Sequence, residues 1–562
     1  MNKIYYYLLI VILILFLYFW DTENKYKNFA EMPILSDGRV KPLESFAKSN
    51  FNTLFYKKKN KYYSYYIAEI IFSFDAFSKK KIFKITDESI LINMDMQKTK
   101  TNLYSFIEIF SGIFKNIEII NIISKSDFTL LNASQIELLN IYNKILFILN
   151  MRETFKVLTN LSYISDSTEY IKYNNNEEYF YIIKKNDGMW TNLNNNDLST
   201  IISVNGNIIQ TLIAMQNFYI NKNITHWSKE CFIFNTYSNS KFKPHEYLKF
   251  KIELLYNKVN FLLYSVICYL LFFVLACLIT IKSFYKKYTG ILEFMLLTGF
   301  IFSFCDLILR FFISERPPVT NLYESIIFVN FVCTLFFLIV INKIKTQVSL
   351  IIIALALFLL QLIGYNYNYD AEIKNLMSVL NTNFWLTLHV LTITTGYASC
   401  LISSILGHVT LYYSVKNDED SSQKFFNYTY LFLLISLFFV FNGTILGGIW
   451  ADQSWGRFWG WDPKENGALL VVLWLVLILH VKLINKSKVI FSIGAIELST
   501  VVALSWFGVN ILNVGLHSYG FTKSMSVWLL LFIFFELVYI CVSLYIYKEK
   551  KINLKQYLFL LK

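Results

Sequence analysis

Long apolar runs alternate with polar segments along the chain, and the runs are unevenly distributed. One run of 17 residues occupies positions 4–20, and the others begin only after residue 257. Each is close to the ~20 residues that a helix needs to cross the hydrocarbon core of a bilayer. The pattern predicts a first span at 4–20 and later spans at 258–281, 291–313, 324–342, 347–364, 384–411, 427–446, 464–482, 489–511 and 524–547.

The first apolar run has two interpretations. Lys3 precedes it and Asp21 follows it, and a secretory signal peptide has a similar positive start and apolar centre. A signal peptide is followed by a cleavage site of small residues, which the segment after Trp20 does not provide. We therefore favour an uncleaved span with its N-terminus inside the cell.

Residues 21–257 form a long polar segment. It is rich in Asn and Lys, mixes helical and strand-like patterns, and contains no apolar run of spanning length. The predicted fold is a polytopic all-α membrane protein of about ten transmembrane helices, with a soluble domain of mixed or uncertain class inserted after the first span. Its predicted parts are a transmembrane helix at 1–20, the soluble domain at 21–257 and a membrane domain at 258–562.

The charges of the loops orient the predicted spans. The segments IKSFYKK, NKIK, VKLINKSK and YKEKKINLK are basic and fall on one side of the predicted topology. The segments SERPPVTNLYES, GYNYNYDAEI, GLHSYG and a tryptophan-rich loop fall on the other side. Because basic loops tend to stay in the cytoplasm, the second set and the soluble domain are predicted to be extracytoplasmic.

Composition agrees with a membrane protein and argues against two other classes. Of 562 residues, 55% are hydrophobic, which is high for a soluble enzyme. The net charge of +13 is scattered rather than gathered in a basic helix or stripe, so we predict no nucleic-acid partner. The seven cysteines stand singly, and without a CxxCH motif the chain is not itself a c-type cytochrome.

The loop at 447–463 concentrates aromatic residues beside a predicted span. An aromatic belt at the lipid headgroups explains one or two tryptophans per helix, and this loop exceeds that density. Its glycines would let the backbone approach a flat ligand, its rings offer stacking area, and Arg457 suits an anionic group. The loop thus predicts a platform for a planar macrocycle with carboxylates, such as haem. Its rings are Trp450, Trp455, Phe458, Trp459 and Trp461, and its glycines are Gly447, Gly448, Gly456 and Gly460.

The end of this loop also has a purely structural interpretation. Asp462 suits the N-cap of the next helix, Pro463 its first position and Glu465 its third, which together make a capping box. This local role does not exclude contact between Asp462 and a ligand.

Four of the six histidines lie in the membrane half. His389 and His517 lie near the predicted outer ends of spans, on the side of the aromatic loop, whereas His408 and His480 lie toward the inner ends. His389 and His408 share one predicted helix and are 19 residues apart, about 28 Å, so they cannot bind the same iron. We predict an outer and an inner pair of imidazoles, each able to supply axial ligands to a haem iron.

Charged residues also occur in and beside an earlier span. Asp306 and Arg310 lie one helical turn apart, which favours an internal ion pair. Four residues at the following outer loop are predicted to shape the wall of the platform: Arg316, Asn321, Tyr323 and Glu324.

Several motifs resemble one known family. GGIWADQSWGRFWGWDPKENGALLVVLWLVLILH resembles the WWD signature of the haem-handling cytochrome c assembly proteins. PPVTNLYESIIF and NILNVGLHSYG are similar to the CcsA-type cytochrome c synthases of the System II pathway, and the likeness covers roughly residues 290–545. MPILSDGRVKPLESFAKSN resembles a segment of some fused assembly proteins, which implies a fusion to a CcsB-like part.

The resemblance implies a reaction and its participants. In that family haem b reaches the outer face of the membrane, where the CxxCH cysteines of an apocytochrome c add across its vinyl groups. It implies that His389 and His517 are the external, catalytic iron ligands and that His480 is a transmembrane ligand. It also implies thiol-reducing membrane partners and a location in the bacterial inner membrane.

The sequence departs from the fused synthases in one respect, and three alternative functions stay open. Fused synthases carry a partner histidine in an N-terminal span, but no predicted span before residue 384 contains one, so the inner site is altered or absent, or His408 replaces it. The alternatives are a haem exporter or delivery protein without thioether chemistry, an ion or proton transporter, and a structural subunit that recruits cytochrome or reductant.

Overall fold

A computed structural model describes residues 25–54, 63–85, 87–126, 131–154, 181–184, 189–191, 198–281, 285–367, 373, 383–484, 487–508 and 523–560. The chain divides into two compact units, and the boundary lies between Val259 and Asn260.

The unit before this boundary is largely helical, with three two-stranded antiparallel sheets in its described part. Its described strands are β1 (Pro33–Ser36), β2 (Arg39–Pro42), β3 (Phe83–Lys84), β4 (Leu103–Tyr104), β5 (Ile183–Lys184) and β6 (Trp190–Thr191). Its helices are α2 (Lys27–Ala30), α3 (Leu43–Leu54), α4 (Ser64–Phe72), α5 (Phe74–Ser78), α6 (Glu88–Asn93), α7 (Phe106–Lys115), α8 (Ile117–Lys125), α9 (Ala133–Thr154), α11 (Leu198–Ile220), α12 (Ile224–Ser240) and α13 (Pro244–Lys258).

Local sequence explains several of these elements. Asp37 and Gly38 both have positive φ, the conformation that a tight hairpin turn between β1 and β2 requires. Ser105 and Glu108 form a reciprocal capping box that starts α7. Trp227 is fully buried, and its ring packs against Phe29 and Tyr219 within a larger cluster of buried apolar side chains. This unit therefore has a hydrophobic core of its own.

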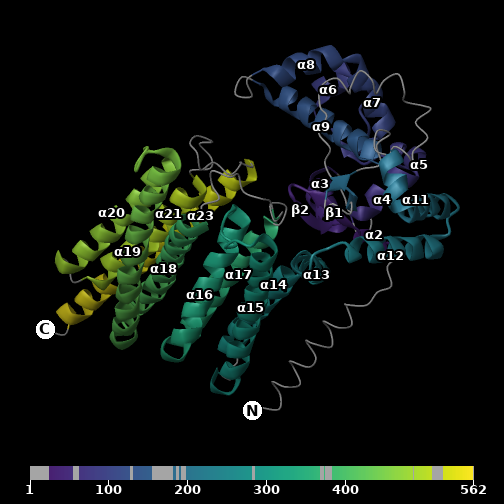
Figure 1. Ribbon diagram of the computed structural model, residues 1–562. Helices are drawn as coiled ribbons and strands as arrows, with labels where there is room; N and C mark the ends of the chain where they lie inside the picture. Colours follow the sequence, from purple (N-terminus) through teal and green to yellow (C-terminus); the bar gives the residue numbers. More distant parts are fainter. Residues whose placement is uncertain are drawn as a thin grey trace. The chain divides into compact units, whose positions relative to one another are not determined.

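The second unit is a bundle of long helices that run side by side (Figure 1). They are α14 (Phe261–Ile281), α15 (Tyr285–Ser314), α16 (Leu322–Ile344), α17 (Gln347–Asn366), α18 (Asn383–Lys416), α19 (Glu419–Trp455), α20 (Pro463–Ile484), α21 (Lys488–Ala503), the π-helical turn η5 (Leu504–Gly508) and α23 (Lys523–Leu560). Within the described residues, nine helical segments are long and apolar enough to cross a membrane.

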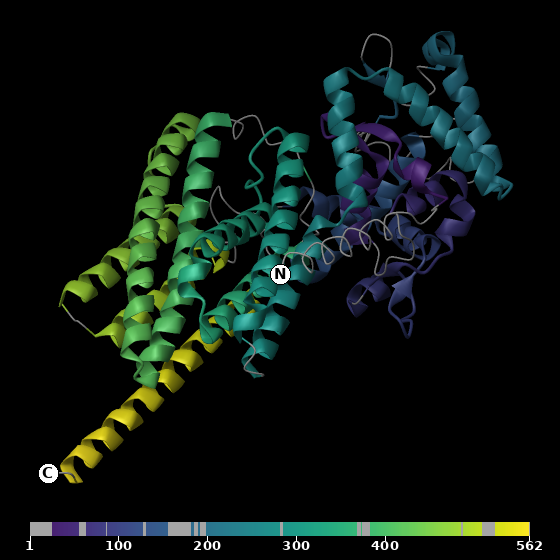
Figure 2. The same cartoon turned by 90° about the horizontal axis from the view of Figure 1, so that it is seen from below.

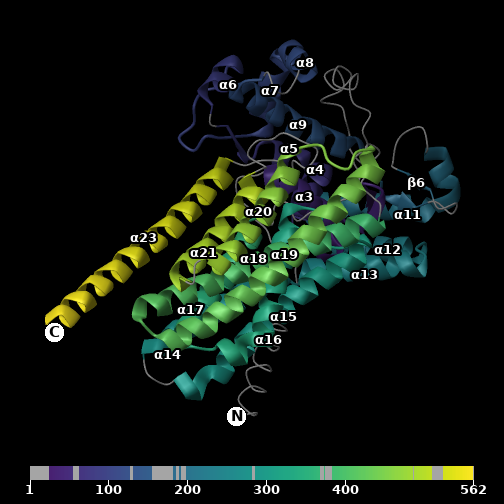
Figure 3. The same cartoon turned by 90° about the vertical axis from the view of Figure 1, so that its left-hand side faces the viewer.

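These nine segments confirm the nine spans predicted after residue 257, and the chain is a multi-pass, all-α membrane protein. The tenth predicted span, at 4–20, lies outside the described residues. Figures 2 and 3 show α23, drawn in yellow, leaving the rest of the bundle toward its C-terminal end. Its span at Ser526–Lys550 is correspondingly only 22% buried.

Small residues bring α18 and α19 close together. A Cβ atom at Gly396 would lie 2.7 Å from Cγ2 of Val440, and one at Gly443 would lie 2.9 Å from the Ile393 backbone. In lipid, where the hydrophobic effect does not drive helices together, such close contact is a main source of association. The pair α18–α19 supports the candidate site described next.

Candidate functional site

A cavity lies where several helix ends meet at one end of the bundle. The starts of α16, α18 and α20 contribute to it, together with the end of α19 and the η5 turn. Its volume, including its mouth, is ≈ 950 Å³. Its lining includes Thr320, Asn321, His389, Gly447, Gly448, Trp450, Phe458, Trp459, Lys464, Glu465 and Trp506.

His389 is the lining histidine, and its ring is held in place by α19. The imidazole stacks on Trp450, with ring centroids 6.0 Å apart and an interplanar angle of 19°. Its Nδ1 lies 2.8 Å from the carbonyl oxygen of Gly443. Because a carbonyl only accepts hydrogen bonds, Nδ1 is the donor, and in the neutral imidazole the lone pair is then on Nε2. Histidines that bind metals almost always donate their other ring N–H in this way.

The glycines of the aromatic loop have a role besides the predicted one. A Cβ at Gly447 would lie 2.6 Å from Cε1 of His389, and one at Gly448 would lie 2.6 Å from Cζ of Phe458. Gly456 has φ 69° and ends α19 as a left-handed cap. These glycines make room for the protein's own rings and for a turn, and Gly447 and Gly448 also line the cavity, so backbone approach to a ligand there stays a prediction.

The five rings of the loop do not form one flat surface. Trp450, Phe458 and Trp459 line the cavity. Trp455 packs on Trp450 with centroids 5.1 Å apart, whereas Trp461 is 70% exposed. The structure thus places three of the predicted haem-contacting rings in the cavity, one behind them and one at the surface.

The capping role predicted for Asp462 is confirmed. Its Oδ1 accepts a hydrogen bond from the backbone N–H of Lys464 at 2.9 Å. In return, Oε2 of Glu465 accepts from the N–H of Asp462 at 3.2 Å and from that of Gly460 at 2.8 Å. This reciprocal pattern holds the start of α20 at the cavity and presents Lys464 and Glu465 to it.

The positive charge at the cavity differs from the predicted one. Arg457, the cation predicted for an anionic group, is exposed and is not among the residues that line the cavity. Lys464 is the single lysine or arginine among the described residues that line the cavity. No contact of Lys464 was predicted from the sequence, since the direction of its side chain depends on how α20 begins.

Two other predicted ligands, His408 and His480, are not among the residues that line the cavity. His480 is exposed on α20, with Nδ1 2.8 Å from the carbonyl oxygen of Val476. His408 is engaged at both ring nitrogens: Nδ1 lies 2.9 Å from the Ser404 carbonyl, and Nε2 lies 2.9 Å from Oε2 of Glu536. His517 lies outside the described residues. The outer and inner ligand pairs therefore stay predictions.

The charged residues predicted for the wall form a buried cluster. Arg310 donates to Oε1 of Glu324 at 2.7 Å, and its guanidinium lies over the ring of Tyr323 at 5.0 Å. Sequence spacing indicated Asp306 as the partner of Arg310 because it lies one turn away, and it missed Glu324, which lies on the next helix. A contact between helices leaves no local signal in the sequence.

The sequence around this cavity is similar to known proteins. A family model described as cytochrome C assembly protein matches residues 319–517, which include the cavity. The cytochrome c biogenesis protein CcsA of Prochlorococcus marinus is 30% identical over 275 residues, covering 41% of this chain and 84% of that protein. The chain belongs to the CcsA-type cytochrome c assembly family.

Further relatives support this membership. CcsA of Welwitschia mirabilis is 29% identical over 264 residues, 40% of this chain and 85% of that protein. Protein NrfI of Wolinella succinogenes is 29% identical over 289 residues, which is 48% of this chain and 31% of NrfI, so the match spans about a third of that relative. This CcsA-type chain therefore has a role in cytochrome c biogenesis.

Proposed function

We propose that this CcsA-type protein binds haem in the cavity, with His389 as an axial ligand of the iron, and joins that haem to an apocytochrome c. The observation that carries the proposal is the state of His389. Its ring lines a cavity together with three rings of the aromatic loop, and its bond to Gly443 leaves the lone pair of the neutral imidazole on Nε2. An imidazole of this tautomer among stacking rings has the chemistry that a haem substrate needs.

The remaining cavity residues suit the other parts of haem. Trp450, Phe458 and Trp459 offer apolar and stacking area for the macrocycle. Lys464 supplies a cation for a propionate carboxylate. His517 is the proposed second ligand. The proposed catalysis is mainly positioning, because the rings and imidazoles would hold the vinyl groups where two thiols can reach them.

Thioether formation needs no oxidant. Each cysteine thiol of the CxxCH motif adds across one vinyl group, so that sulfur bonds to one vinyl carbon and the thiol proton passes to the other. The cysteines must stay reduced, which requires the proposed thiol-reducing membrane partners. We propose that the cavity end and the unit before Val259 lie outside the cytoplasm of a bacterial inner membrane, as the loop charges predict.

The first experiment measures haem directly. The full chain is purified in detergent from haem-replete cells, and oxidised and reduced absorption spectra are recorded for wild type, His389→Ala and His517→Ala. His226→Ala is a matched control, since His226 lies on α12 of the other unit. We expect a low-spin, b-type spectrum in wild type and control, and its loss or shift in both ligand variants. Haem-free wild type contradicts the proposal, and an unchanged spectrum in His389→Ala overturns the ligand assignment.

A second experiment separates synthesis from delivery. The protein is expressed with a CxxCH reporter in a host that lacks other cytochrome c assembly factors. Covalent haem on the reporter, retained after denaturation, supports thioether formation. Haem bound by the protein without any covalent product instead favours a haem exporter or delivery protein.

A further inference from the structure

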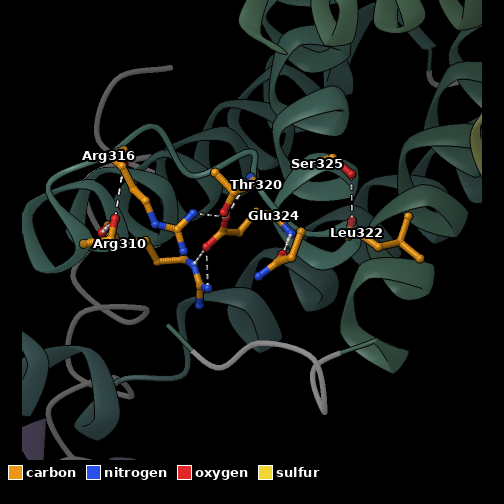
Figure 4. Close-up of polar contacts among 8 residues, drawn as sticks. Arg310, Arg316, Thr320, Leu322, Glu324 and Ser325 are labelled. Atoms are coloured by element: carbon orange, nitrogen blue, oxygen red, sulfur yellow. Dashed lines mark hydrogen bonds and ion pairs between the residues drawn. The ribbon is translucent and has the colours of Figure 1, made fainter. Parts of the chain in front are cut away.

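The linker between α15 and α16 forms part of the cavity wall. Residues 315–321 have no regular secondary structure, and Val319, Thr320 and Asn321 line the cavity, followed by Leu322 and Ser325 of α16. A linker of this kind has few backbone hydrogen bonds of its own, so its position depends on side-chain contacts. Figure 4 shows these contacts gathered on Glu324.

Glu324 ties three segments together. Its Oε1 accepts from Nη2 of Arg310 on α15 at 2.7 Å and from Nε at 3.2 Å. Its Oε2 accepts from the backbone N–H of Thr320 at 3.0 Å and from the hydroxyl of Thr320 at 2.9 Å. Nη1 of Arg316 lies 3.8 Å from the same oxygen. One carboxylate thus joins α15, the linker and the first turn of α16.

These charges are almost completely removed from solvent. The exposed fractions are 0% for Arg310, 1% for Glu324 and 7% for Arg316. A buried ion pair costs desolvation energy, and removal of one partner leaves the other charge uncompensated. Without the Glu324 carboxylate, Arg310 and Arg316 would lose one buried counter-charge, and the linker would lose the acceptor for Thr320.

We propose that Glu324 is a positioning residue, which sets the cavity wall formed by residues 319–322 without lining the cavity itself. Thr320 connects the two features, since it binds Glu324 and also lines the cavity. Asn321, its neighbour, caps α16 by accepting from the N–H of Glu324 at 2.7 Å, and also lines the cavity. The effect of Glu324 on bound haem rests on the proposed function, whereas its effect on the wall does not.

The test compares Glu324→Gln with wild type in the full-length protein. Gln keeps the shape of Glu but has no charge, and its NH2 group cannot accept a hydrogen bond. Hydrogen exchange at the Thr320 amide is expected to accelerate about tenfold or more, as for the loss of a charged hydrogen bond. In the haem-bound protein we expect a shifted Soret band and reduction potential at unchanged haem content.

Two further variants keep the inference falsifiable. Asn330→Ala is the matched control, because Asn330 lies on the same helix, is fully buried and donates to Gln361. It should lower stability without changing Thr320 exchange or the haem spectrum. Glu324→Asp keeps the charge on a shorter side chain and should change Thr320 exchange less than Glu324→Gln does. If the Gln variant fails to fold, the Asp variant is compared with wild type instead.

The outcomes separate this inference from the proposed function. If Glu324→Gln has the same Thr320 exchange rate and the same haem spectrum as wild type, the positioning role is overturned. Equal spectral shifts in Asn330→Ala also overturn it, because they would reflect general destabilisation. Wild type that carries no haem contradicts the proposed function, while faster Thr320 exchange in Glu324→Gln would still support the role of Glu324 in the wall.

Discussion

His389 and His408 lie on the same helix, α18, and have opposite surroundings. His389 donates one N–H to Gly443 of α19, stacks on Trp450 and lines the cavity. His408 has a carbonyl at one ring nitrogen and the Glu536 carboxylate of α23 at the other, and its ring lies 4.8 Å from that of Tyr539. An iron could bind His408 only after its bond to Glu536 had broken.

The comparison teaches that residue type and helix depth do not define a ligand. Both histidines are partly buried in a membrane helix, where an ionisable group by default indicates function. Both imidazoles have a carbonyl at Nδ1, the kind of contact that orients metal-binding histidines. They differ in their other surroundings: His389 lines the cavity beside Trp450, whereas the Glu536 carboxylate at Nε2 of His408 joins two helices. The four predictions that follow test this distinction.

The largest effect is expected for His389→Ala. Loss of a hydrogen-bond partner behind a metal ligand costs ~10–100-fold in affinity, so loss of the ligand itself should cost at least about 100-fold. Haem titration of the purified protein, followed at the Soret band, measures this change. His389→Gln fills a similar space without an imidazole and should behave like Ala. If His389→Ala binds haem within a few-fold of the wild-type affinity, His389 is no more an iron ligand than His408.

His408→Ala should affect stability instead of haem. Removal of the imidazole leaves the partly buried Glu536 carboxylate without this partner, which costs about 1–3 kcal/mol. Thermal unfolding in detergent should show the loss, while the spectrum of cavity-bound haem stays unchanged. His480→Ala is the comparison, because His480 is exposed and bonds within its own helix, so its stability effect should stay within ~0.5 kcal/mol. A lower haem content in either variant would instead support the predicted inner site.

Gly447→Ala should weaken haem binding without removing the ligand. Its Cβ would lie 2.6 Å from Cε1 of His389, so the ring must move, and such overpacking typically costs ~1–3 kcal/mol. A fall in haem affinity of about tenfold is expected if half of this cost reaches the bound state. Gly456→Ala is the control: it strains a left-handed residue that has nothing within 4 Å of its Cβ position. It should reduce stability and leave the haem spectrum unaltered.

The smallest effect is expected for Lys464→Met. Loss of one charge-assisted contact to a propionate from this half-buried lysine should lower haem affinity about fivefold. Arg457→Met, which removes an exposed cation apart from the cavity lining, should change it less than about twofold. The reverse order of these two effects would restore Arg457 as the contact to the anionic group.

Much of the fold followed from local patterns. The nine spans after residue 257 are runs of apolar residues, and the length of a run is visible in the chain without knowledge of its neighbours. The cap of α20 was equally predictable, because Asp462 and Glu465 act within one turn. The aromatic loop indicated a ligand platform for the same reason, since its residues are adjacent in sequence.

Contacts between helices could not be predicted from these local patterns. The loop glycines face His389 and Phe458, Arg310 pairs with Glu324, and Lys464 rather than Arg457 lines the cavity. Each depends on which faces of two helices meet, and a helical period leaves that choice open. Spacing along the chain was thus sufficient for the spans, the cap and the candidate ligands. Packing alone assigned His389 to the cavity and His408 to Glu536, because hydrogen-bond partners on other helices determine what an imidazole can bind.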